Sequence, residues 1–381
     1  MPATPTTIPP TPASLEPAPA AWSELESWLT AAWQSNTPPS LVQQALQQTG
    51  WQSKQSHLQA FDLDGDSRDE WLVTLYALPN DPIFNSGGYG DLGQFWIVNS
   101  QGVPFRIDRM ASLFEAAPEV VTVADFTGDN RYEVVVQSTG CGAHTCFQAY
   151  EIISAHWGGW RNLVQRADAP TETAAFIHIS SSDAATLDTN GDGVYDFVVH
   201  GGAIGSAGAG IHRQYTEVWR WNGAHMALAE ITWDETNYRH HHLYAGNEAL
   251  AAGNIEQAVD LYLSVIEDKT LIDVPAFVGD GDSYDDSLTF AAFHLALIAL
   301  RQGDLIQATT WDGWLQLVYP GHPLTEAVSL MIQTWESSQD LTAACAAVTA
   351  FLSGFAQPTG VLENLGYGNP SLTAADVCPA P

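Results

Sequence analysis

Between about residues 51 and 236 the chain alternates short apolar runs with polar turns. The clearest runs are rich in β-branched and aromatic residues and cover residues 71–76, 134–137 and 197–200. Runs of this kind are typical of strands. Three further runs each lead through a glycine-containing turn into a return strand, and they begin at Phe95, Tyr150 and Tyr215. The pattern therefore predicts that each repeating unit forms a sheet of about four strands.

From about residue 240 the pattern changes from period 2 to helical spacing. Small and aromatic residues recur where two helix pairs need them, namely Tyr244, Gly253, Ala258 and Tyr262, then Ala296, Gly303, Ala308 and Pro320. This pattern resembles tetratricopeptide repeats and implies a helical domain at residues 240–356, with an irregular third pair at about 324–355. Most of these small residues serve close helix packing. The domain is then either a face for a peptide or partner domain, or a helical cap on the β part.

Three nine-residue acidic segments line up without a gap, at 62–70, 125–133 and 188–196, and their starts are 63 residues apart both times. Each keeps an acid at positions 1, 5 and 9, an oxygen-bearing side chain at 3 and glycine at 4. Such segments can be simple turns. Turn chemistry does not require the three acids, however, whereas a loop around a hard cation does. We therefore expect calcium-binding loops.

Position 12, where an EF-hand has its closing glutamate, is a valine in all three segments: Val73, Val136 and Val199. The acid at position 9 closes these loops instead, and a strand follows directly. The chain thus resembles the FG-GAP or VCBS-type repeats of integrin-like β-propellers, whose blades carry an Asp-x-Asp/Asn-x-Asp-Gly-x-x-Asp loop between two strands. The resemblance implies one Ca²⁺ per loop, so up to three ions, each stabilising a turn without taking part in chemistry.

The resemblance also implies the ligands. Side-chain ligands would be Asp62, Asp64, Asp66 and Glu70 in the first loop, Asp125, Thr127, Asp129 and Glu133 in the second, and Asp188, Asn190, Asp192 and Asp196 in the third. Backbone carbonyl ligands would come from position 7, which is Arg68, Arg131 and Val194. Thr127 stands where the family has Asp or Asn, so the second loop is expected to bind most weakly, and the third is the closest match.

The predicted fold is therefore multidomain, β then α: a propeller-like array of three four-stranded blades followed by a tetratricopeptide-like helical domain. Whether three blades close a ring, form an arc or are completed by another chain stays open. The expected boundaries are a Pro/Thr-rich linker at 1–21, a helical segment at 22–50, the blades at 51–236, the helices at 240–356 and a tail at 357–381.

The charge of the chain limits the classes of partner that it can bind. The chain has 44 acidic and 12 basic residues and a formal net charge of −32. Phosphate backbones would be repelled, so we expect no nucleic-acid partner, and anionic membranes are disfavoured for the same reason. No run of about 18 apolar residues predicts a membrane span. The linker and the loops favour an extracellular or surface-tethered protein whose true start, with an export signal, lies upstream.

The four cysteines also favour an exported protein, because they can form disulfides. Their spacing predicts two disulfides, Cys141–Cys146 and Cys345–Cys378, the second pinning the tail to the helices. A zinc site built on Cys141, His144 and Cys146 would need a fourth ligand that the sequence does not identify.

Candidate chemistry is sparse. The sequence has no Gly-x-Ser-x-Gly, His-Glu-x-x-His or P-loop motif. We expect His240, His241 and His242 to be structural or solvated, residues 201–210 to be a flexible glycine-rich loop, and the acidic residues 280–286 to be a solvated loop. The preferred function is a non-enzymatic binding or scaffold protein for a protein or glycan partner. The alternative is an exported hydrolase or lyase acting on polysaccharide or peptide, with Trp219, Trp221 and Trp233 lining a sugar site.

Overall fold

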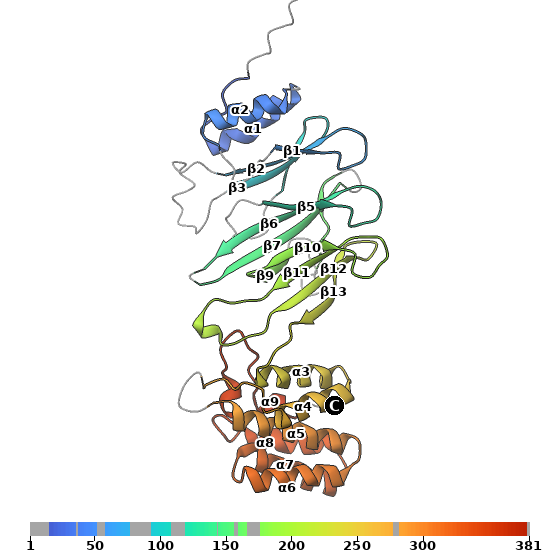
Figure 1. The fold of residues 1–381 in the computed structure, drawn as a ribbon, viewed down its shortest axis with the longest axis vertical. Coiled ribbons are helices and arrows are strands. Elements are labelled where there is room, and N and C mark those ends of the chain that lie inside the picture. The colour runs from blue at the N-terminus through green and yellow to red at the C-terminus, as the bar shows by residue number, and fades with distance from the viewer. Residues whose placement is uncertain are drawn as a thin grey trace, which may run out of the picture. The chain divides into compact units, whose positions relative to one another are not determined.

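The structure is a computed structural model that describes residues 15–35, 37–51, 58–76, 93–107, 119–142, 144–155, 159–165, 176–276 and 282–378. It divides into two compact units (Figure 1). The β unit comprises Met1–Gly202 and Tyr215–Thr232, and the helical unit comprises Ala203–Gln214 and Trp233–Pro381. After a first pair of helices within residues 22–48, antiparallel sheets precede the remaining α-helices along the chain, which confirms the predicted β-then-α class.

The described part of the β unit contains three antiparallel sheets, and each begins with the strand before an acidic loop. The first contains β1 (Leu58–Phe61), β2 (Glu70–Tyr76), β3 (Gly93–Val98) and β4 (Pro104–Ile107). The second contains β5 (Glu119–Ala124), β6 (Glu133–Cys141), β7 (Cys146–Ser154) and β8 (Arg161–Asn162), with β9 (Ile177–Ser180) also on β7. The third contains β10 (Asp183–Leu187), β11 (Asp196–Gly201), β12 (Tyr215–Trp221) and β13 (Met226–Trp233). The second sheet thus has a fifth strand that the repeat pattern did not predict.

The sheets pack face to face because successive side chains of a strand point to opposite faces. In the first sheet, Val73 and Trp96 pack against α1 (Trp22–Gln34) and α2 (Pro39–Gln48), which cover that face. Their neighbours Leu72 and Ile97 point the other way, toward Val134 of the second sheet. A helix pair therefore lies where a further sheet would otherwise pack.

The second sheet repeats this division of faces. Val135 and Ile152, next to residues that face the first sheet, pack instead against Phe197 and Trp219 of the third. All four side chains are almost fully buried. The apolar strands between the loops thus build continuous cores from sheet to sheet, and this packing fixes where each loop begins and ends.

The helical unit consists of three helix pairs and a tail that packs on them. The pairs are α3 (Arg239–Ala251) with α4 (Ile255–Glu267), α5 (Tyr284–Arg301) with α6 (Leu305–Val318), and α7 (Pro323–Ser338) with α8 (Leu341–Leu352), and α9 (Ala374–Val377) lies in the tail. Gly253 and Gly303 turn the first two pairs with left-handed φ of +78° and +77°. A Cβ on Gly246 would stand 2.8 Å from the Tyr262 ring, so glycine lets α3 and α4 pack closely. Within the described residues, no helix has the length and apolar character to cross a membrane.

The glycine-rich segment after β11 is not a flexible loop, as the sequence suggested, because residues 203–214 belong to the helical unit. Tyr367 donates its backbone N–H to the carbonyl of Gly208 (3.1 Å). Gly210 has φ +73°, and a Cβ there would stand 1.8 Å from the carbonyl oxygen of Leu365. Glycines are needed here because the segment packs directly against the backbone of the tail.

The acidic stretch 280–286 also differs from expectation where it is described. Residues 277–281 lie outside the described part of the chain. From Tyr284 the stretch is the first turn of α5 rather than a solvated loop. Asp286 is largely buried and accepts hydrogen bonds from the backbone N–H of Val361 (2.8 Å) and from the ring of His322 (3.1 Å). This carboxylate therefore fixes the tail to α5.

Candidate metal centre

Each acidic loop joins the first two strands of its sheet, and the three loops follow the same backbone path. The glycine at position 4 is left-handed in every loop, with φ of +79° at Gly65, +75° at Gly128 and +76° at Gly191. Position 6 is left-handed as well, with φ of +67° at Ser67, +64° at Asn130 and +89° at Gly193. The repeat of sequence is therefore also a repeat of conformation.

The acids at positions 1 and 5 bind the loop's own backbone in the same way each time. The position 1 carboxylate accepts from the N–H groups of positions 4 and 6, at 2.9 and 3.0 Å for Asp62, 2.7 and 2.8 Å for Asp125, and 2.7 and 3.0 Å for Asp188. The position 5 carboxylate accepts from the N–H of position 7, at 2.8 Å for Asp66, 2.9 Å for Asp129 and 2.8 Å for Asp192. These bonds orient acidic side chains within a single turn.

The loops of neighbouring sheets touch each other, so they lie along one side of the stacked sheets (Figure 1). Tyr132 in the second loop donates its N–H to the carbonyl of Leu63 in the first, at 2.9 Å. A Cβ on Gly128 of the second loop would stand 2.9 Å from the Val194 side chain of the third. Contact between acidic loops brings like charges toward one another, and cations between carboxylates reduce that repulsion.

The acid at position 9 is the buried member of each loop: Glu70, Glu133 and Asp196 are 1%, 0% and 2% exposed. Each accepts the N–H of position 2. Burial raises the pKa of Glu70, and the charges of Asp64 and Asp66 add to the rise. Burial likewise raises the pKa of Glu133 to about 7, with a further contribution from its acidic neighbours. These two sites disfavour an unpaired carboxylate and would be relieved by a cation.

The first loop fits a calcium ion best. One carboxylate oxygen each from Asp62, Asp64 and Glu70 lies within 4.8 Å of the others, the one such acidic cluster among the described residues. Oxygens on opposite sides of a calcium ion stand about 5 Å apart, given Ca–O distances of about 2.4 Å. Asp66, the fourth predicted side-chain ligand, lies outside this cluster, and its Oδ2 contacts the Ser100 hydroxyl at 3.4 Å. The donor set is all oxygen, as this ion requires.

The three acids of the second loop do not form such a cluster among the described residues, and its position 3 carries a weaker donor. The hydroxyl oxygen of Thr127 is buried and has no hydrogen-bond partner in the described structure. A buried hydroxyl without a partner is costly, so a ligand on this oxygen would remove an unfavourable state. The two oxygens of Glu133 accept only neutral donors, from Phe126 N–H (2.9 Å) and from the Ser154 hydroxyl (2.8 Å).

The third loop is the closest match by sequence, but its closing acid, Asp196, is already paired with a positively charged side chain. Arg220 on β12 makes a two-point contact with Asp196, with Nε–Oδ1 and Nη2–Oδ2 distances of 3.0 Å each. Thr189 also hydrogen-bonds Asp196 through its backbone N–H and its hydroxyl. Burial alone would raise the pKa of Asp196, but these hydrogen bonds and the Arg220 charge lower it below its ordinary value.

Sequence reasoning missed the residues that contact the closing acids from the next strand or from the turn that follows it. They are Ser100, whose N–H donates to Glu70 (3.2 Å), Ser154 and Arg220. No spacing within the loops points to them. The register of the sheet decides: Phe197 pairs with Trp219, so the preceding Asp196 lies opposite the following Arg220.

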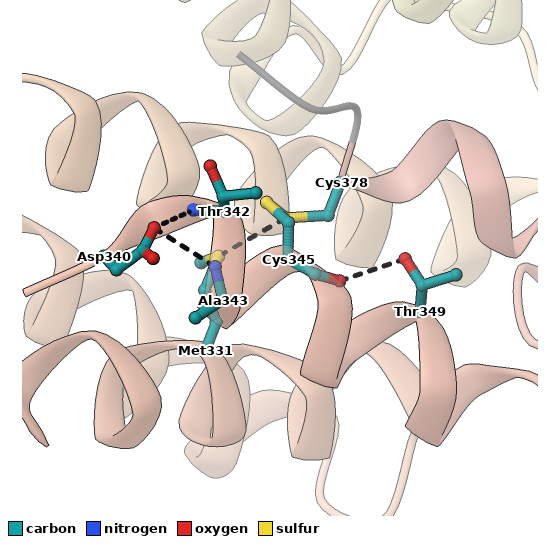
Figure 2. Close-up of a disulfide and its surroundings, with 7 residues drawn as sticks. All are labelled: Met331, Asp340, Thr342, Ala343, Cys345, Thr349 and Cys378. Carbon is teal, nitrogen blue, oxygen red and sulfur yellow. Dashed lines mark hydrogen bonds between the residues drawn. A yellow bond between two sulfur atoms is a disulfide. The ribbon is translucent and has the colours of Figure 1, made fainter. Parts of the chain in front are cut away.

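The two predicted disulfides are formed, and no free cysteine remains. Cys141 and Cys146 pair across the end of the β6–β7 hairpin. Cys378, after α9, is joined to Cys345 on α8, and its sulfur lies 4.0 Å from that of Met331 (Figure 2). With both sulfurs of the first pair bonded to each other, residues 141–146 hold no thiolate for zinc.

His240 and His241, the buried members of the histidine cluster, have a structural role. The Nε2 atoms of His240 and His241 lie 3.0 and 3.2 Å from one backbone carbonyl, that of Ile211. Both rings therefore donate Nε2–H to the same oxygen. Burial lowers the pKa of His241 to about 3 and also lowers that of His240. The pair holds the 203–214 segment against α3.

Comparisons with protein-family models, with curated proteins and with solved structures find no match to this chain.

Proposed function

We propose that the chain is a calcium-stabilised binding or scaffold protein that engages a protein or glycan partner outside the cell or at its surface. One observation carries the proposal: in the described structure no basic side chain reaches Glu70 or Glu133, although both close an acidic loop and are buried. An uncompensated buried carboxylate costs several kcal/mol. Calcium supplies the missing charge and accepts the oxygen donors that these loops present.

The repeat architecture supports the family resemblance as part of this proposal. Each sheet opens with a strand, an acidic loop and a second strand, as FG-GAP or VCBS-type blades do. The helix pairs turn at Gly253 and Gly303, corresponding positions of tetratricopeptide-like units. We therefore regard the sheets as propeller-like blades and the helical unit as a tetratricopeptide-like domain. Both kinds of repeat serve as interaction scaffolds.

The setting we propose is extracellular and oxidising. Two disulfides and no free cysteine favour such a compartment. Calcium loops of extracellular modules bind in the range of about 0.1–1 mM, a concentration met outside cells. In this proposal the ion has a structural role, and the chain performs no catalytic step.

Thermal unfolding of the full chain in calcium, in magnesium and in excess chelator tests the proposal. Strand and helix signals are followed separately by circular dichroism. Calcium is expected to raise the midpoint of the strand transition and leave the helical one unchanged, because all three loops belong to the β unit. Magnesium is expected to do much less, since it demands a tighter octahedral site.

A matched pair of variants locates the effect. Asp64→Asn removes a carboxylate of the 4.8 Å cluster and is expected to reduce the calcium-induced shift. Asp69→Asn removes an equal charge from position 8 of the same loop, where the side chain is exposed, and is expected to keep the full shift. A calcium shift that is absent in the wild type, or equal in both variants, would reject the proposed role of the loops.

A further inference from the structure

The three loops differ in the residue that faces their closing acid. We propose that the guanidinium of Arg220 is a built-in cation that takes the place of calcium in the third loop, so that only the first two loops bind the ion. This inference rests on the proposed calcium function. It departs from the sequence expectation, in which the third loop has the best ligand set.

The first support is the geometry of the ion pair. Arg220 contacts both oxygens of Asp196, Nε to Oδ1 and Nη2 to Oδ2, at 3.0 Å each. Nη2 also donates to the hydroxyl of Thr189 at 2.8 Å. Asp196 has 3% of its side chain exposed and Arg220 has 31%, so the carboxylate is shielded while the arginine stem covers it. A planar guanidinium fork is well matched to a carboxylate in this arrangement.

The second support is the contrast with the other loops. Glu133 occupies the position of Asp196 but receives a serine hydroxyl and a backbone N–H. Glu70 receives two backbone N–H groups. Neither of these glutamates has a cationic partner among the described residues, whereas Asp196 is paired with Arg220. A calcium ion in the third loop would have to displace Arg220 or lie beside a like charge.

The third support comes from the remaining donors of that loop. The side-chain amide of Asn190 donates to Oδ2 of Asp192 at 2.8 Å. The second oxygen of the position 5 acid is thus used within the loop. In the first loop the corresponding pair is Asp64 and Asp66, two carboxylates that cannot donate to each other when ionised. The third loop is therefore internally satisfied at positions 3, 5 and 9 without an ion.

The fold explains why this exchange is possible. Strand β12 runs antiparallel to β11, and Phe197 pairs with Trp219, which sets Arg220 opposite Asp196. In the second sheet Val134 pairs with Ile153, which sets Ser154 opposite Glu133. A single residue on the neighbouring strand thus decides whether a loop of this shape needs a metal or carries its own cation.

Counting bound ions in the full chain tests the inference. Isothermal titration with calcium is expected to give two ions per chain for the wild type. Asp62→Asn and Asp125→Asn are each expected to lose one, whereas Asp188→Asn, the same change at position 1 of the third loop, keeps two. These three variants leave Arg220 in place, so the test does not depend on a variant that lacks it.

Removing the arginine is expected to create the third site. Arg220→Met should raise the count from two ions to three and should unfold at lower temperature than the wild type in chelator, with calcium restoring the loss. Arg106→Met is the matched control, because it removes one positive charge from a different pair, with Glu26 at 3.4 Å. The control is expected to bind two ions.

The outcomes separate the inference from the function on which it rests. Three ions on the wild type, an ion lost from Asp188→Asn, or a count of two for folded Arg220→Met would overturn the role of Arg220 and leave the calcium function standing. A flat titration for every variant would instead reject the calcium function, and the inference with it. Two ions rising to three with Arg220→Met supports both.

Discussion

At position 6 of the acidic loops, one of the three residues adopts a backbone conformation that its residue type disfavours. Ser67 has φ +67° where the equivalent residues are Asn130 and Gly193. Glycine takes this conformation freely and asparagine tolerates it, whereas serine does so at a cost of roughly 1 kcal/mol. The first loop therefore combines the best donor set with the least suitable residue at this turn.

Ser67→Gly is expected to raise the free energy of unfolding of the β unit by about 1 kcal/mol, because it relieves the left-handed strain. Chemical denaturation followed by the strand signal measures the change. Ser35→Gly is the control: Ser35 is exposed and has φ −82°, so glycine there only adds freedom to the unfolded chain and should lower stability. Equal losses from both substitutions would contradict the strain argument.

At the scale of elements, the 63-residue period was enough to predict the loops and the strands on either side of them, because apolar alternation and turn residues act locally. Strand β9 could not be predicted this way, since it adds to β7 through pairing that no repeat requires. The contact between Arg220 and Asp196 could not be predicted either, because it depends on how β11 and β12 pair and not on sequence spacing within the loop. Glycine content likewise marked residues 201–210 as conformationally free without showing what they pack against.

The two disulfides differ as cross-links because they close loops of different length, with sequence separations of 5 and 33 residues. Chain-entropy arguments give about 2 kcal/mol for the shorter loop and about 4 kcal/mol for the longer. The Cys141–Cys146 hairpin is also held by ladder pairs between β6 and β7, whereas the tail before Cys378 contains only short helices. The longer bridge is therefore expected to matter more.

Replacing Cys345 and Cys378 by alanine should lower the free energy of unfolding of the helical unit by about 4 kcal/mol. The same change at Cys141 and Cys146 should cost the β unit about 2 kcal/mol. Urea denaturation read from helix and strand signals gives each loss. A larger loss from the hairpin pair would show that loop length does not control the effect in this chain.

At the scale of the whole molecule, the two units are stabilised by groups that respond to different solution conditions. The β unit carries the acidic loops, for which we propose calcium. The helical unit holds three buried histidines, His240, His241 and His294, of which the last is 1% exposed and stacks on Phe290 with ring centroids 4.4 Å apart. Burial lowers the pKa of His294 to about 4, an effect to which the charge of Arg301 adds. Acidity should therefore destabilise the helical unit.

The sign follows from where the proton binds. An unfolded imidazole takes up a proton near pH 6.5, whereas folded His294 stays neutral down to about pH 4 and His241 down to about pH 3. Their contribution to stability is complete above pH 6.5 and is lost as the pH falls through this window. At pH 5 the burial of each neutral histidine should have lowered the free energy of unfolding by about 2 kcal/mol. The helical transition is expected to weaken by about 4 kcal/mol between pH 7 and pH 5 from these two alone.

His294→Phe checks this assignment, since a phenyl ring keeps the contact with Phe290 but cannot bind a proton. Urea denaturation at pH 7 and pH 5 should show a fall in helical stability that is smaller by about 2 kcal/mol in this variant. His144→Gln changes an exposed histidine of the β unit and should leave the helical pH dependence as it is. If His294→Phe keeps the full slope, the protons that destabilise the helices bind elsewhere. A reduced slope ties the acid sensitivity of the helical unit to one buried ring, separate from the calcium sensitivity proposed for the sheets.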